Sequence, residues 1–126
     1  MCIRDSHSDM SLWDTYRTAH PLYTLLYPDA ARDFARSLLA MAEEGGAFPR
    51  WPAALGDGGS MIGAPADIVM ADTYLRGVTD IRMDDAWPRL RAQSLGEVDA
   101  GYNGRTGTSE IDSLGWIPSD VPVRPL

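Results

Sequence analysis

A stripe of apolar residues at helical spacing in residues 30–44 constrains the fold of this chain more than any other feature. Ala31, Phe34, Leu38 and Met41 recur at intervals of three and four, so they fall on one side of a helix. Two glycines follow residue 44 and favour ending the helix there. The pattern therefore predicts an amphipathic helix that buries one face against other elements.

Further helices are predicted downstream, and no segment of any length has the period-two pattern of a strand. Residues 64–78 form the second predicted helix, and Pro65 suits its first position. The stripe expected to be buried there consists of Ile68, Ala71, Leu75 and Val78. We expect a third helix over residues 84–95, with Pro88 tolerated near its start, and one more turn over residues 109–114. The fold class indicated is all-α, with long irregular loops.

The composition excludes several classes of partner. The chain has 126 residues, within the range of one domain, and its net charge is −7 at pH 7. A nucleic-acid surface would need clustered Lys or Arg, and no apolar run approaches the ~20 residues of a transmembrane helix. The single cysteine, Cys2, excludes an internal disulfide and a cysteine-based metal site. We therefore expect no nucleic-acid partner and no membrane partner.

The first residues have the character of a leader. Residues 1–6, Met-Cys-Ile-Arg-Asp-Ser, resemble a translated sequencing adapter of the kind found at the start of metagenomic reading frames. Segments of such origin do not belong to fold reasoning. We therefore expect residues 1–10 to be a non-native leader, and residues 11–126 to be the natural part of the chain.

A short segment after this leader has the residue types of a sugar-binding surface. Trp13 lies three positions before Tyr16 and four before Arg17, so one helical turn places them on one side, next to Asp14. Ring C–H groups of a sugar stack on indole, and ionised side chains hold vicinal hydroxyls. A structural interpretation stays open, in which both aromatic rings are core and Asp14 caps a helix or pairs with Arg17.

The chain that follows this segment contains two prolines and a loop with two aromatic residues. We expect a break near Pro21, an apolar face continuing over Leu22, Leu25 and Leu26, and Asp29 as the N-cap of the next helix. In the loop of residues 47–63, Phe48 and Trp51 need either a core to dock on or a ligand to stack on. Neither of the two histidines supports a metal site.

The order of these motifs resembles that of one known family. The segments that carry the resemblance are SLWDTYRTAHPL over 11–22, RSLLAM over 36–41, EGG over 44–46, PRW over 49–51, MIG over 61–63, AD over 66–67, ADTYLRGV over 71–78 and GWIP over 115–118. Taken together over nearly the whole natural part, they resemble glycoside hydrolase family 92, the calcium-dependent exo-acting α-mannosidases.

The resemblance implies a fold and an activity. Family members combine a β-sandwich with an (α/α)₆ toroid, and they hydrolyse terminal α-mannosides with inversion, using an active site that includes calcium. Inversion needs an acid and a base about 6.5–9.5 Å apart. In the family these two carboxylates lie downstream of the region covered here, so we expect residues 11–126 to be a partial catalytic domain. It would be the opening helices of the toroid, inactive by itself, with the calcium ligands elsewhere.

The resemblance also implies partners and a location. The partners would be mannose-containing glycans and the remainder of the same enzyme, and the location would be secreted or periplasmic. Carried over from the family motif, Trp13, Asp14 and Arg17 are candidates for gripping the non-reducing-end mannose, and Trp51 and Asp67 are weaker candidates near the same pocket. The resemblance assigns no catalytic residue and no metal ligand to this chain. This chain departs from the family pattern at Ala64-Pro65 and over residues 79–83.

Two other interpretations stay open at this point. One is a piece of another toroidal glycosidase family with a different sugar. The other is a small helical interaction module that folds by itself. A toroid fragment would expose an apolar patch larger than the few hundred Å² typical of monomers, because its helices are made to touch neighbours on two sides.

Overall fold

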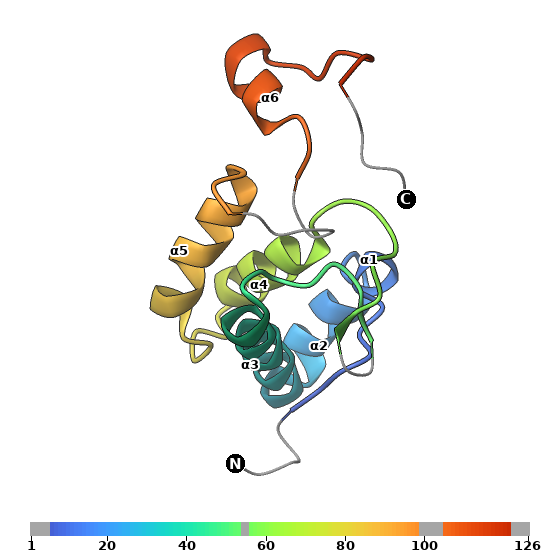
Figure 1. Ribbon diagram of the computed structural model, residues 1–126. Helices are drawn as coiled ribbons and strands as arrows, with labels where there is room; N and C mark the ends of the chain where they lie inside the picture. The colour runs from blue at the N-terminus through green and yellow to red at the C-terminus, as the bar shows by residue number, and fades with distance from the viewer. Residues whose placement is uncertain (1–5, 54–55, 99–104, 122–126) are drawn as a thin grey trace.

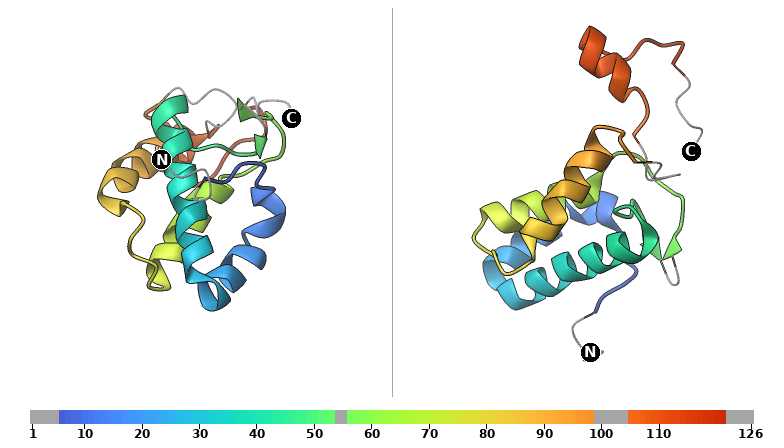
Figure 2. Two further views of the ribbon diagram at one scale, coloured as in Figure 1. Left: turned by 90° about the horizontal axis from the view of Figure 1, so that it is seen from below. Right: turned by 60° about the vertical axis from the view of Figure 1, so that its left-hand side comes forward.

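The computed structural model describes residues 6–53, 56–98 and 105–121 and confirms the all-α class. The elements in chain order are α1 (Leu12–Thr15), α2 (Ala19–Leu26), α3 (Pro28–Gly45), β1 (Pro52–Ala53), β2 (Gly56–Asp57), α4 (Pro65–Leu75), α5 (Met83–Ser94) and α6 (Thr108–Leu114). Helices α1 to α5 form a bundle, and α6 stands away from it (Figures 1 and 2). The two short strands pair antiparallel and form a small hairpin that the sequence pattern did not predict. No described helix is long and apolar enough to span a membrane.

Helix α3 confirms the amphipathic helix predicted over residues 30–44. It begins with Pro28 at its first position, and Asp29 lies in its first turn rather than at the N-cap, which is Tyr27. It ends at Gly46, whose φ of 83° is left-handed and whose N–H donates to the carbonyl of Ala42. The side chains that it buries are Ala31, Ala35, Ser37, Leu38, Leu39 and Ala42, with Phe34 and Met41 partly buried beside them.

The hydrophobic core lies where α3, α4 and the loop after α3 meet. Phe48 from this loop is 1% exposed. Its N–H donates to Gln93 Oε1 of α5 at 2.7 Å, and its carbonyl accepts from Gln93 Nε2 at 3.0 Å. Other large side chains buried with it are Leu12, Leu38, Leu39, Val69, Met70 and Ile81. The core interpretation of Phe48 is therefore confirmed, and Gln93 satisfies the backbone groups that this burial removes from water.

Helix α4 begins within one residue of the predicted start and ends at Leu75, three residues before the predicted end. Three of the four side chains expected to be buried are exposed, and only Val78 packs against the core. Ile68 is 47% exposed, Leu75 is 82% exposed and Ala71 is also exposed. The helix instead buries Pro65, Ala66, Val69, Met70 and Thr73. Apolar residues lie on both sides of this helix, so periodicity identifies a helix without deciding which side meets the core. Packing against α2 and α3 decides it.

The break between α1 and α2 lies earlier than predicted. Residues 16–18 form the turn, and α2 begins at Ala19 with Pro21 in its first turn, where the missing N–H has no helical partner to lose. The helix buries His20. The predicted apolar face is wrong, since Leu22, Leu25 and Leu26 are all exposed.

Helix α5 confirms the third predicted helix to within one residue at each end. It passes through Pro88, which lies beyond the first turn, so one helical hydrogen bond is absent there. Ala86 and Leu90 pack into the core and hold the helix across this gap. Helix α6 confirms the turn predicted over residues 109–114 and buries no side chain.

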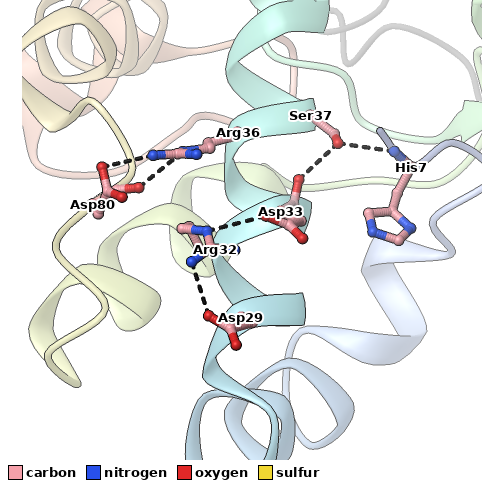
Figure 3. Close-up of polar contacts among 7 residues, drawn as sticks. All are labelled: His7, Asp29, Arg32, Asp33, Arg36, Ser37 and Asp80. Carbon is pink, nitrogen blue, oxygen red and sulfur yellow. Dashed lines mark hydrogen bonds and ion pairs between the residues drawn. The ribbon is translucent and has the colours of Figure 1, made fainter. Parts of the chain in front are cut away.

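Arg36 of α3 binds the loop between α4 and α5. Its Nε donates to the Asp80 carbonyl at 3.0 Å, and its Nη2 pairs with the Asp80 carboxylate at 2.6 Å (Figure 3). Next to this contact, Ile81 is completely buried. Exposed ion pairs contribute ~0–1 kcal/mol, so Arg36 orients the loop while burial of Ile81 stabilises it.

Residues 7–10 lie against α3, although we expect a leader over residues 1–10. The His7 N–H donates to Ser37 Oγ at 2.9 Å (Figure 3). The centroid of the His7 ring lies 4.5 Å from that of the Phe34 ring. Met10 is buried in the core. The described part of this segment packs on the fold, and the extent of the leader stays a prediction.

Protonation of His20 is expected to destabilise the bundle. His20 is 5% exposed beside the rings of Tyr23 and Phe34, and burial lowers its pKa below the ordinary 6.5. At pH values between the lowered pKa of native His20 and the ordinary pKa of about 6.5 in the unfolded chain, the unfolded chain binds more protons than the native chain. The free energy of unfolding therefore falls as the pH drops below about 6.5 and is not affected above it.

The check compares the wild type with His20→Phe by denaturant unfolding between pH 7.5 and 5. The wild type should lose more stability than the variant over this range. His7→Gln serves as the control and should follow the wild type. A difference between wild type and His20→Phe that stays constant with pH contradicts the prediction.

Candidate functional site

The candidate sugar site is built on α1, a helix of only four residues. Leu12 in this helix is fully buried and anchors it in the core. The Thr15 hydroxyl donates to the Ser11 carbonyl at 2.9 Å and closes the turn. This anchoring leaves Trp13 half-buried and Asp14 exposed. The core thus sets the orientation of a helix too short to be stable in isolation.

Arg17 lies against two aromatic rings of this segment. Its Cζ is 5.0 Å from the centroid of the Trp13 ring and 4.5 Å from that of the Tyr16 ring. Both distances are within the range of cation–π attraction, worth about 0.5–1 kcal/mol each at exposed sites. The predicted placement of Trp13, Tyr16 and Arg17 on one side is therefore observed.

The opposite charges of this cluster do not neutralise each other. Within residues 6–53, 56–98 and 105–121, no hydrogen bond or ion pair engages the Asp14 carboxylate or the Arg17 guanidinium. Asp14 makes no cap, since α1 has no side-chain cap at Ser11. Both polar alternatives for Asp14, the cap and the pair with Arg17, are absent. The site therefore presents a carboxylate acceptor and guanidinium donors beside an indole.

Trp51 lies in a separate place, at the base of the β1–β2 hairpin. The backbone N–H groups of Arg50 and Trp51 donate to Asp57 Oδ2 at 2.6 and 2.9 Å, and that of Gly59 donates to Oδ1 at 2.8 Å. A Cβ on Gly58 would lie 3.2 Å from Trp51 Cδ1, so the backbone that follows β2 passes close to this ring. Asp57 was not singled out from the sequence. An aspartate within a Gly-Asp-Gly-Gly run is nevertheless typical of turns in which the carboxylate accepts hydrogen bonds from nearby backbone N–H groups.

Asp67 is held by protein partners rather than open to solvent. Its Oδ2 accepts from Ser94 Oγ at 3.0 Å and from Arg105 Nη2 at 2.6 Å, with its side chain 14% exposed. Its Oδ1 is buried and has no partner in the described part of the chain. These partners lie 27 and 38 residues away in sequence, so no local signal could have identified them.

The five predicted binding residues therefore divide into three places. Trp13, Asp14 and Arg17 form one cluster. Among the described residues, no hydrogen bond, ion pair or ring contact joins Trp51 or Asp67 to that cluster.

An apolar groove of about 630 Å³ lies between α4 and α5, with Asp67 and Ser94 at one side. Its apolar lining includes Ala71, Tyr74, Leu75, Trp87, Leu90 and Leu95. Leu75 and Trp87 are 82% and 60% exposed. Of the stripe that periodicity predicted for α4, Ala71 and Leu75 thus line a groove, whereas Val78 packs against the core.

Comparisons with known proteins assign this helical chain to the glycoside hydrolases. It matches the glycosyl hydrolase family 92 catalytic domain over residues 3–124. The chain belongs to glycosyl hydrolase family 92, which confirms the resemblance. No sequence among curated proteins matches it significantly.

One solved structure with a similar fold is a family GH92 inverting mannosidase from Bacteroides thetaiotaomicron. The two share 30% sequence identity with a TM-score of 0.80. The aligned region covers 91% of this chain and 16% of that protein. The alternative of another toroidal glycosidase family is thereby set aside.

The groove between α4 and α5 is expected to bind an apolar dye. Replacing Leu75 and Trp87 together by Gln should lower the fluorescence of bound anilinonaphthalene sulfonate by at least half, because both side chains line the groove. Leu25→Gln, which removes a side chain 75% exposed on α2, is the control and should lower it less. Equal decreases for the two variants would show that the dye has no preference for the groove.

Proposed function

We propose that this chain supplies part of the sugar-binding surface of an inverting exo-α-mannosidase that acts on terminal α-mannosides of glycans. The observation that carries this proposal is the cluster of Trp13, Asp14 and Arg17. In it the Asp14 carboxylate and the Arg17 guanidinium lie unpaired beside the Trp13 ring. Family membership and the mannosidase with a similar fold support it.

The chemistry of the cluster suits a neutral sugar. A carboxylate accepts hydrogen bonds from hydroxyl groups, and a guanidinium donates several in a fixed fork. The indole of Trp13 offers an apolar surface to sugar C–H groups. Together these interactions suit a pyranose ring with vicinal hydroxyls.

Trp51 and Asp67 have less direct parts in this proposal. Trp51 would border the sugar pocket from the hairpin that Asp57 holds together. The Asp67 carboxylate already binds Ser94 and Arg105 through Oδ2, and its Oδ1 is buried, so Asp67 would order the protein next to the pocket rather than contact the sugar.

The catalytic acid and base belong, in this proposal, to the rest of the enzyme. No group of three His, Cys, Asp or Glu side chains that could hold a metal occurs in the described residues. We expect the calcium ligands of the family to lie elsewhere in the catalytic domain. The same proposal places the enzyme in a secreted or periplasmic location.

Removal of the Asp14 charge should weaken sugar binding. Asp14→Asn is expected to raise the dissociation constant for methyl α-mannoside roughly tenfold, because a hydrogen bond to a charged group is worth about 1.5–3 kcal/mol. The measurement is a titration of the ¹⁵N-labelled chain followed by NMR. Asp84→Asn, an exposed carboxylate in the first turn of α5, is the matched control and should leave binding unchanged. An Asp14→Asn variant that binds like the wild type would remove this residue from the site.

The 126-residue chain should not hydrolyse α-mannosides by itself. An aryl α-mannoside incubated with the chain and calcium should release no more phenol than a chain-free control, since inversion needs two positioned carboxyl groups. Calcium-dependent turnover by the purified chain would contradict the proposal that the acid and base lie elsewhere.

A small helical interaction module is the competing function, and the common core that α1, α3, α4 and α5 share is the observation that favours it. A chain made for that function would unfold cooperatively as a monomer. A partial catalytic domain would bind apolar dyes and aggregate, because its groove is made for further helices.

A further inference from the structure

Tyr16 makes the shorter of the two ring contacts to Arg17, although the family motif marks only Trp13, Asp14 and Arg17 for the sugar. The Arg17 Cζ lies 4.5 Å from the Tyr16 ring centroid, against 5.0 Å for Trp13. Tyr16 is half-buried and packs against the hydrophobic core. Its ring is therefore fixed by the protein, whereas Arg17 is exposed.

An exposed arginine without a carboxylate partner samples many rotamers, because its side chain carries about 2 kcal/mol of rotamer entropy. Contact with a fixed ring restricts these rotamers and leaves the N–H donors available. In the described part of the chain, no acceptor engages those donors. Orientation before binding improves affinity by reducing the entropy lost on binding.

We propose that Tyr16 is a positioning residue of the sugar site, whose ring holds the Arg17 guanidinium in the orientation that donates to vicinal hydroxyls. This rests on the proposed function, in which Arg17 binds the terminal sugar. Asp14 presents an exposed carboxylate on the same short segment, which repels a phosphorylated or acidic ligand, so the ligand class is a neutral sugar.

The test uses the full chain with Tyr16→Phe, which keeps the ring, and Tyr16→Leu, which removes it. Tyr16→Met preserves apolar volume and replaces the Leu variant if that variant does not fold. Tyr27→Leu, which removes an exposed tyrosine at the junction of α2 and α3, is the control. One readout is the upfield ring-current shift of the Arg17 Hδ protons without ligand. The other is the dissociation constant for methyl α-mannoside, with mannose 6-phosphate as the anionic comparison.

We expect Tyr16→Phe to keep both the shift and the affinity. Tyr16→Leu or Tyr16→Met should lose part of the shift and bind roughly two- to fivefold more weakly, the equivalent of one cation–π contact. Mannose 6-phosphate should bind more weakly than methyl α-mannoside to every variant.

Four results would overturn the inference. Wild-type affinity in a folded Leu or Met variant would show that the ring does not position Arg17 for binding. Loss of affinity in Tyr16→Phe would show that the hydroxyl itself contacts the sugar. Tighter binding of mannose 6-phosphate would overturn the ligand class. If the wild type shows the ring-current shift but binds no sugar, the proposed function fails, and the role of Tyr16 in binding fails with it.

Discussion

Burial of one side of α3 is the constraint on which the rest of this structure depends. Leu38 and Leu39 of this helix are completely buried, and the loop after it returns Phe48 to the same core. That return is possible because Gln93 of α5 satisfies both backbone groups of Phe48. A buried N–H and carbonyl without partners would each cost about 1–3 kcal/mol. One side chain thus couples the burial of a loop to the placement of a helix 45 residues away.

The candidate sugar site takes its geometry from this core. A helix of four residues such as α1 has no stability of its own, and its conformation follows from the burial of Leu12. Once α1 is anchored, Trp13 and Tyr16 flank the position that the Arg17 guanidinium takes. Because the rings attract the guanidinium, Asp14 keeps its acceptors. A surface ion pair between Asp14 and Arg17 would have left neither charge for a ligand.

Helix α4 connects the core to the surface that the fold leaves uncovered. Val69 and Met70 face inward, while Leu75 lines the groove toward α5. A helix with apolar residues on opposite sides is made to lie between two layers of protein. The chain covers 16% of the family 92 mannosidase with which it shares its fold, and we propose that further helices of the catalytic domain fill this groove.

Residue spacing determined the existence and the approximate ends of α3, α4 and α5, because glycine, proline and apolar periodicity act locally. It also placed Trp13, Tyr16 and Arg17 on one side, since one helical turn suffices for that. Tertiary structure alone decided which side of α4 meets the core, why the leucines of α2 stay exposed, and that Asp67 binds Arg105 instead of lying open. These outcomes depend on partners tens of residues away, and spacing along the chain carries no information about such distances in space.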